Sequence, residues 1–240
     1  MSEIFAHRGL HVSEVENTVT AFLEARTLGV DGVELDVRRT RDGALVVYHD
    51  DAIADLGGIA ELDCRDLPGT VATLDEAMIA CSGLRVNVEI KNDAGSATYD
   101  ATGGLARQVV VALLEGGWRD SVLVSSFDLA TCQATRSADD TIAIGWLLDW
   151  RHPTSESLAT TVAEGFNAVH PFFGRIDEAT IAAAHGCGLA VNVWTVNGRE
   201  DMTRLVAWGV DGLITDDPVT AMAVVAARPG SPDGRAIVIP

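Results

Sequence analysis

The sequence predicts an α/β protein of the TIM (β/α)8-barrel class, with a short extra segment after the second strand. Short runs rich in β-branched residues alternate with amphipathic helical patterns from one end of the chain to the other. About eight such strand–helix units occur in 240 residues, and 48% of the residues are hydrophobic, which is ample for one large core. Eight units in a chain of this length are typical of a closed parallel barrel.

The expected strands are short and aliphatic, and they cover residues 4–7, 32–37, 85–90, 122–125, 142–147, 168–170, 190–194 and 212–215. The helical patterns that follow them cover residues 18–28, 74–80, 105–114, 129–137, 158–164, 178–185, 200–208 and 218–227. Two features interrupt the alternation, namely an extra extended run at 45–49 before a glycine-rich loop and a tail rich in proline and glycine. We therefore expect a single barrel domain over 1–228 and a C-terminal tail over 229–240.

The composition excludes several classes of partner. The formal net charge is −18 and the sequence pI is about 4.5, which argues against nucleic-acid binding and against an anionic membrane surface.

The four cysteines show no CxxC spacing, as expected for free thiols in a reducing compartment. With no apolar run long enough to span a membrane and no signal-peptide pattern, we expect a cytoplasmic location without stable membrane insertion. Assembly into a homo-oligomer is left open.

Acidic residues alternate with aliphatic residues in two of the expected strands. Glu34 and Asp36 lie two residues apart, so they project from the same face of their strand, and Glu89 alternates with aliphatics in the same way. A barrel strand packs its aliphatic face against helices, which leaves the acidic face inside the barrel. Three buried carboxylates need a cation, and an all-oxygen ligand set favours one divalent Mg²⁺ or Ca²⁺ over zinc. An open antiparallel sheet with a solvated acidic face is the alternative, which the strand–helix alternation disfavours.

Two histidines and two cations fall beside this acidic cluster. His7 ends the first strand, and His49 ends the extended run after the second strand. A pair of histidines can serve as general acid and general base. Arg8 offers a planar donor fork, and Lys91 projects in the same direction as Glu89. A metal with these two cations would form a locally positive site that suits a phosphate ester.

Three further polar positions support weaker hypotheses. His170 ends the sixth strand, where a substrate contact and a structural role are about equally well supported. His11 lies in the first loop and is more typical of a solvated residue. Asn17 and Thr18 are typical of a helix N-cap.

Several motifs occur in order along nearly the whole chain: HRG at 7–9, ENT at 16–18, GVELDVRRTRDGALVVYHD at 32–50, VEIK at 88–91, SSF at 125–127, and VNVWTVN followed by GVDGLITDDP. Together they resemble the glycerophosphodiester phosphodiesterase family. HRG and ENT are weak signals alone, whereas the 32–50 block followed by VEIK is specific. The resemblance implies a TIM barrel, a divalent cation, and hydrolysis of a small-molecule glycerophosphodiester to glycerol 3-phosphate and an alcohol.

The resemblance also assigns roles by position. It implies metal ligands at Glu34, Asp36 and Glu89, an acid–base pair at His7 and His49, phosphate contacts from Arg8 and Lys91, and a substrate-facing aromatic side chain at Trp194. The order of proton transfer is open, and the nucleophile is either water or a hydroxyl of the substrate itself.

One departure from the family pattern concerns the segment 52–73, which is shorter here than the insertion of many relatives. A smaller cap leaves the mouth of the barrel more open and leaves the substrate range undecided. A phospholipase D- or C-like activity on lysophospholipids is therefore one alternative, and a non-catalytic metal-binding barrel is another.

Overall fold

Eight parallel strands form a closed barrel in the computed structural model, which describes residues 1–96 and 98–228. In chain order they are β1 (Glu3–Ala6), β2 (Gly32–Arg39), β6 (Arg85–Ile90), β7 (Val122–Ser126), β8 (Ala143–Leu148), β9 (Ala168–Pro171), β10 (Ala190–Val193) and β11 (Gly212–Thr215). Strand β1 pairs in parallel with both β2 and β11, and these two pairings close the sheet. The predicted TIM barrel is confirmed.

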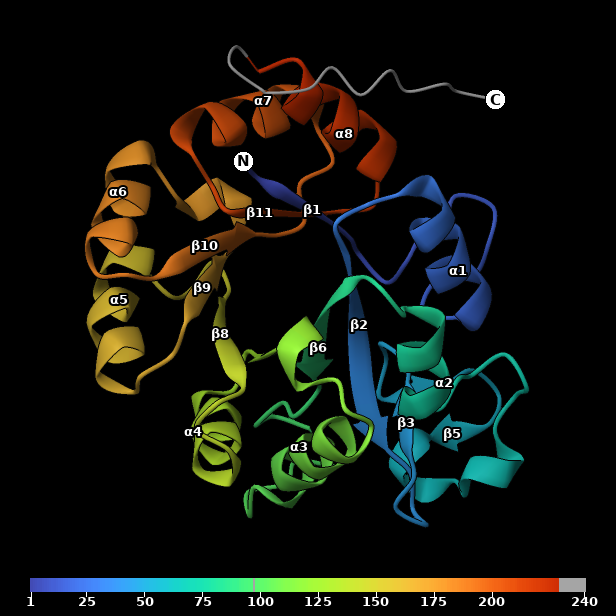
Figure 1. Ribbon diagram of the computed structural model, residues 1–240. Coiled ribbons are helices and arrows are strands. Elements are labelled where there is room, and N and C mark those ends of the chain that lie inside the picture. Colours follow the sequence, from blue (N-terminus) through green and yellow to red (C-terminus); the bar gives the residue numbers. More distant parts are fainter. Residues whose placement is uncertain (97, 229–240) are drawn as a thin grey trace.

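A helix follows each barrel strand, and the eight helices surround the strands (Figure 1). They are α1 (Val19–Leu28), α2 (Leu74–Ala80), α3 (Gly104–Glu115), α4 (Leu129–Ala138), α5 (Thr154–Ala163), α6 (Glu178–Gly186), α7 (Arg199–Trp208) and α8 (Pro218–Ala226). Helix α5 begins four residues before the predicted start at position 158. The first turn of α5 is mostly polar, so hydrophobic periodicity in the sequence does not reveal it. This turn begins because the backbone carbonyl of Pro153 accepts hydrogen bonds from the N–H groups of Glu156 and Ser157.

The strands divide their side chains between two environments. On β2, Val33, Leu35 and Val37 are fully buried in the aliphatic core shared with the helices. Glu34 and Asp36 alternate with them and are 2% and 1% exposed, so they lie inside the barrel and not on a solvated face. The alternation in the sequence therefore correctly predicted which residues are internal.

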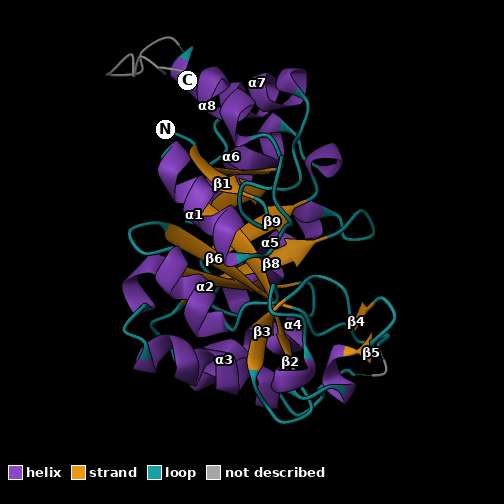
Figure 2. Ribbon diagram, turned by 90° about the vertical axis from the view of Figure 1, so that its right-hand side faces the viewer, coloured by secondary structure: helices purple, strands orange, loops and turns teal. Residues whose placement is uncertain are grey.

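The reduced insertion after β2 still forms a small structured cap. Strand β3 (Leu45–Val47) pairs antiparallel with the C-terminal end of β2. The chain then forms a two-stranded hairpin, β4 (Ala52–Ile53) with β5 (Gly57–Gly58), and the short 3-10 helices η1 (Ile59–Glu61) and η2 (Cys64–Asp66). The hairpin stands apart from the main sheet (Figure 2). Ile59 is 1% exposed, so the cap is packed onto the barrel.

Two further 3-10 helices, η3 (Arg119–Ser121) and η4 (Phe173–Arg175), lie in connecting loops. The four cysteines all fall within the described ranges, and none of them forms a disulfide. Over residues 1–96 and 98–228, no helix has the length and apolar character needed to cross a membrane. The predicted tail, 229–240, lies outside the described residues.

Candidate active site

Three carboxylates from two adjacent strands converge inside the barrel. The parallel register of β2 and β6 places Glu34 beside Asn87 and Asp36 beside Glu89. Oxygen atoms of Glu34, Asp36 and Glu89 lie within 4.8 Å of one another, and all three residues are buried. The geometry thus brings together the three residues predicted as metal ligands.

Two cations contact this cluster but do not neutralise it. Lys91 Nζ lies 2.8 Å from Glu89 Oε1 and 3.5 Å from Asp36 Oδ1, and Arg8 Nε lies 3.3 Å from Asp36 Oδ2. Burial acts to raise the pKa of Asp36, but Lys91 and Arg8 hold it below its ordinary value. By contrast, burial and the repulsion of Asp36 and Glu89 raise the pKa of Glu34 well above its ordinary value. One carboxylate therefore lacks sufficient compensating charge.

The cluster fits a hard divalent cation. Glu34 Oε1 is buried and has no hydrogen-bond partner among the described residues. The pKa of Glu89 is also raised, chiefly by burial. An orphaned carboxylate oxygen and an excess of buried negative charge are what a resident Mg²⁺ or Ca²⁺ would remove, and all the available donors are oxygen atoms. Glu34, Asp36 and Glu89 are the residues that could hold it.

The loop after β1 supports the cluster from one side. The backbone N–H of Arg8 donates to Glu34 Oε2 at 3.1 Å, and Arg8 Nη1 donates to Glu16 Oε1 at 2.8 Å. Asn17 was expected to be part of a helix N-cap, but only Thr18 caps α1. The Asn17 amide instead donates to Asp36 Oδ2 at 2.8 Å and accepts from the Asp36 backbone N–H at 3.3 Å. Asn17 thus orients a predicted metal ligand.

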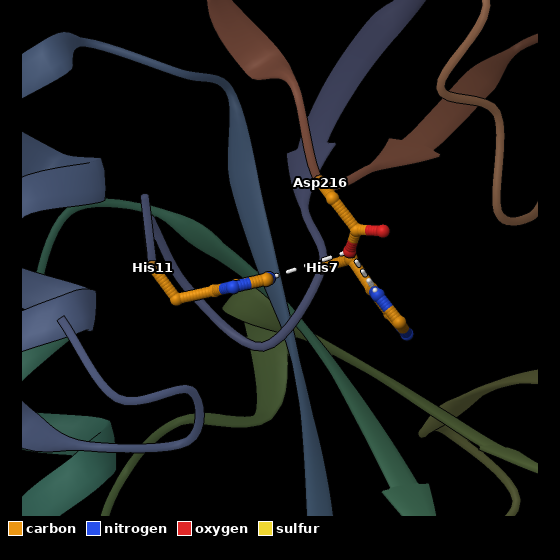
Figure 3. Close-up of side chains that lie close together, drawn as sticks. All are labelled: His7, His11 and Asp216. Atoms are coloured by element: carbon orange, nitrogen blue, oxygen red, sulfur yellow. Dashed lines mark hydrogen bonds and ion pairs between the residues drawn. The ribbon is translucent and has the colours of Figure 1, made fainter. Parts of the chain in front are cut away.

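His7 forms a short pair with a carboxylate from the last strand of the barrel. Its Nδ1 lies 2.6 Å from Asp216 Oδ1, and its Nε2 lies 3.9 Å from Glu34 Oε2. His11, expected to be a solvated loop residue, also points at Asp216, with Nε2 3.3 Å from the same oxygen (Figure 3). The amide of Asn197 donates to Asp216 Oδ2 at 2.6 Å. These contacts hold the pKa of Asp216 below its ordinary value, although burial acts to raise it.

His49 has an equivalent partner on its own loop. Its Nδ1 lies 2.7 Å from Asp50 Oδ1, and its side chain is about one-third exposed. The backbone carbonyl of His49 accepts two hydrogen bonds from Arg38, from Nε at 2.9 Å and from Nη2 at 2.6 Å. Each predicted catalytic histidine is therefore oriented through Nδ1 by an aspartate, which leaves Nε2 available to exchange a proton.

A cavity of about 200 Å³ connects these groups. Its polar lining includes both histidines, Arg8, Lys91, Glu34, Glu89 and Asn87, and its apolar lining includes Phe127, Leu147, Trp194 and Ile214. Trp194 packs edge-on against Phe127 at 5.2 Å between ring centroids, and its indole N–H donates to the backbone carbonyl of His170 at 2.8 Å. The lining of the cavity therefore combines charged side chains with apolar ones.

The model of the glycerophosphoryl diester phosphodiesterase family matches residues 7–220, which is most of the chain. The chain belongs to this family. A glycerophosphodiester phosphodiesterase of Caldanaerobacter subterraneus subsp. tengcongensis is 32% identical, over 92% of this chain and 97% of the relative. A probable glycerophosphodiester phosphodiesterase 2 of Mycobacterium tuberculosis is 30% identical, over 95% of this chain and 92% of the relative.

Solved structures of the family share the fold. That of a glycerophosphodiester phosphodiesterase from Thermotoga maritima has a TM-score of 0.75 at 27% identity and covers 93% of this chain and 97% of that one. That of an Oleispira antarctica phosphodiesterase in complex with the product sn-glycerol-3-phosphate has a TM-score of 0.81 at 22% identity and covers 94% and 97%. As a member of this family, the chain is an enzyme, a phosphoric diester hydrolase, which removes the alternative of a non-catalytic barrel.

One predicted site residue lies outside the cavity lining. His170 is 0% exposed and is not among the residues that line the cavity. Its Nε2 accepts a hydrogen bond from the Asn192 amide at 2.9 Å, and burial lowers its pKa to about 3. A neutral imidazole enclosed within the barrel cannot contact a substrate at the mouth, so we correct the substrate-binding role predicted for His170 to a structural one.

The most important residue that sequence reasoning missed is Asp216. The GVDGLITDDP motif contains it, but no role was assigned to it. A signal was nevertheless available, because strands β1 and β11 become neighbours when the barrel closes and Ala6 pairs with Thr215. The next residues along the two strands are His7 and Asp216, so closure alone places them side by side at the carboxyl-terminal mouth.

Proposed function

We propose that this enzyme hydrolyses glycerophosphodiesters to glycerol 3-phosphate and an alcohol, with a divalent cation at Glu34, Asp36 and Glu89 and with His7 and His49 as the acid–base pair. The product bound by the Oleispira antarctica relative is the phosphate ester that this reaction would release. A cytoplasmic location remains a prediction of the sequence.

One observation carries this proposal. A single cavity of about 200 Å³ is lined by two of the three clustered carboxylates and by both histidines, and each histidine has an aspartate on Nδ1. Phosphodiester hydrolysis needs charge neutralisation at the phosphoryl oxygens, a base for the nucleophile and an acid for the leaving oxygen. The cavity supplies groups for all three requirements.

The histidines divide the proton transfers between them. His7 donates its Nδ1–H to Asp216 and His49 donates its Nδ1–H to Asp50, so Nε2 of each ring can accept or deliver a proton. The carboxylates fix the ring orientation and stabilise the imidazolium when it forms. The two histidines lie on different loops, His7 after β1 and His49 after β3, so one ring can act on the nucleophile and the other on the leaving oxygen.

Arg8 and Lys91 supply fixed positive charge at the phosphoryl group. Burial acts to lower the pKa of Lys91, but Glu89 and Asp36 raise it overall, so the side chain stays protonated at neutral pH. The Arg8 guanidinium faces Asp36 through Nε and also lines the cavity, so its remaining N–H groups can donate to a phosphoryl oxygen. A bound Mg²⁺ or Ca²⁺ would add Lewis-acid stabilisation of the developing negative charge.

The test is the release of glycerol 3-phosphate from glycerophosphocholine by wild type, His7→Ala and His49→Ala, each with Mg²⁺, with Ca²⁺ and with chelator. We expect turnover only with added metal, and a loss of about 10²- to 10⁴-fold in each folded variant. Undiminished turnover in chelator would contradict the metal requirement, and an active His49→Ala would contradict the acid–base assignment. Lysophosphatidylcholine, assayed in parallel, tests the lysophospholipid alternative.

A further inference from the structure

A second cavity, of about 230 Å³, lies beside the active site and shares Lys91 with it. Its lining includes three arginines, Arg38, Arg39 and Arg41, together with Asp51. The whole chain has 17 lysines and arginines against 35 acidic residues, so four cations around one small cavity are a marked local excess. The cap also contributes to the lining of this cavity, through Ile59 of η1.

Arg38 is the residue that most needs an explanation. It follows Glu34 and Asp36 on the same face of β2, one pleat nearer the mouth, and it is 8% exposed. In the described part of the chain, its hydrogen bonds go to the His49 carbonyl, and no carboxylate oxygen lies within 4 Å of its guanidinium. A buried cation without a contacting anion is costly, so this position favours an anion from outside the chain.

The other arginines of the cavity are already paired. Arg39 Nη2 lies 3.0 Å from Asp100 Oδ2, and Arg41 Nε lies 2.9 Å from Asp63 Oδ1. These ion pairs hold the two side chains in place around the cavity. Among the three arginines, Arg38 is therefore the one that has no carboxylate in contact with its guanidinium in the described part of the chain. Asp93 and Asp51, together with Asp36 and Glu89 of the acidic cluster, offset part of this charge through space, but none of them contacts the guanidinium.

We propose that this cavity binds the alcohol part of the substrate and that Arg38 selects alcohols carrying a second anionic group, a carboxylate or a phosphate. The proposal rests on the proposed function, because the alcohol is one half of the glycerophosphodiester. A diester whose phosphoryl group lies at Arg8 and Lys91 can extend past Lys91 into the second cavity. The net charge of −18 does not prevent this, because charges more than about 10 Å away are largely screened at physiological ionic strength.

The test compares two substrates that differ by a single carboxylate, glycerophosphoserine and glycerophosphoethanolamine. For wild type we expect kcat/KM to favour the serine diester at least tenfold, the effect of about one hydrogen bond to a charged group. In Arg38→Gln the ratio should fall to near one, because the amide can still donate to the His49 carbonyl but the charge is gone. Glycerophosphoinositol with and without a 4-phosphate repeats the comparison for a phosphate as the second anion.

Further variants keep the result interpretable. Arg38→Lys retains the charge and should keep most of the preference, and Arg41→Gln alters the cavity without touching His49 and should weaken the preference a few fold. Arg65→Gln changes an arginine of the cap that is outside the cavity lining and should leave the ratio unchanged. Comparing these variants by circular dichroism identifies any that fail to fold.

Two outcomes separate the two proposals. Equal kcat/KM for both members of each pair in wild type, or an unchanged ratio in folded Arg38→Gln, overturns the role of Arg38 while leaving the proposed function intact. If glycerophosphoethanolamine and the other three diesters all fail as substrates in the presence of metal, the proposed function itself is overturned.

Discussion

Replacing Asp216 with asparagine should impair catalysis through the tautomer of His7. The Asn197 amide donates to one oxygen of Asp216 at 2.6 Å, while His7 Nδ1 lies 2.6 Å from the other oxygen. An amide introduced at position 216 would turn its oxygen toward the Asn197 donor and its NH₂ toward His7. His7 would then have to accept at Nδ1 and carry its proton on Nε2, where it cannot act as a base. We expect a loss of about 10²- to 10⁴-fold in kcat, similar to His7→Ala.

A second substitution can reverse this loss and so distinguish tautomer control from damage to the fold. In Asp216→Asn/Asn197→Asp, the new carboxylate at 197 accepts from the new amide, whose oxygen can then face His7 again. It can also keep accepting from the backbone N–H of residue 216, as Asn197 Oδ1 does at 2.9 Å. We expect the double variant to recover part of the lost activity, measured as glycerol 3-phosphate release, because the tautomer is restored but the carboxylate that stabilises the His7 imidazolium is not.

The control for this series is Asp217→Asn, the adjacent acidic residue. Asp217 caps α8 by accepting from the Thr220 backbone N–H at 3.0 Å, and asparagine caps helices equally well, so activity should not change. An active Asp216→Asn, or a double variant no better than the single one, would refute the reasoning.

Three other predictions follow from the buried charges. Glu34→Gln should raise the melting temperature in chelator, because it removes a carboxyl group whose pKa is held well above normal by burial and by the repulsion of Asp36 and Glu89. It should also abolish the stabilisation that metal gives wild type, about 2.7 kcal/mol at a hundredfold excess over Kd. His170 has a pKa of about 3 in the folded protein against about 6.5 in the unfolded chain, so only the unfolded chain takes up its proton as the pH is lowered below 6.5, and the folded state loses stability. Between pH 7.5 and pH 5.5, the free energy of unfolding of wild type, measured in urea, should fall by about 1.4 kcal/mol more than that of His170→Gln. Lys91, the only lysine in the sequence, is 9% exposed at its side chain and ion-paired, so intact-mass analysis after amine acylation should show one more adduct on the unfolded protein than on the native protein, at Lys91.

The sequence predicted the cluster of three buried carboxylates because one local rule governs it. Glu34, Asp36 and Glu89 follow period-two alternation, and the aliphatic residues between them show which face meets the helices. The fold class was predictable for a similar reason, since eight strand–helix units leave few alternatives. His170 obeys the same alternation, but depth along the barrel axis depends on strand stagger, which the sequence of one strand does not reveal.

The residues that orient the site were harder to predict because their partners are distant in sequence. Asp216 meets His7 across 209 positions, and Asn17 meets Asp36 across 19. Arg38 was overlooked for another reason. Alternation places it on the internal face, but an arginine at a strand end is ordinarily assigned to solvent, and the short cap that buries it has little regular structure to predict.

The two motifs that are weak signals in the sequence, HRG and ENT, form one connected support in the structure. Arg8 and Asn17 have φ values of 56° and 58°, a left-handed conformation that costs non-glycine residues free energy. The Asn17 N–H donates to the Arg8 carbonyl at 2.9 Å, so the two strained residues hold each other in place. Gly9 between them has a φ of 83°, and a Cβ there would lie 2.9 Å from Ala21.

This strain has a direct consequence for the acidic cluster. The left-handed turn aims the backbone N–H of Arg8 at Glu34 and the amide of Asn17 at Asp36, so two buried carboxylates are held by donors that carry no full charge. Such donors orient the predicted metal ligands without adding positive charge, so they do not relieve the excess of buried negative charge at Glu34. A substitution such as Gly9→Ala should displace both donors together. It should weaken metal binding more than the removal of either hydrogen bond alone, which isothermal titration with Mg²⁺ or Ca²⁺ against Asn17→Ala would measure.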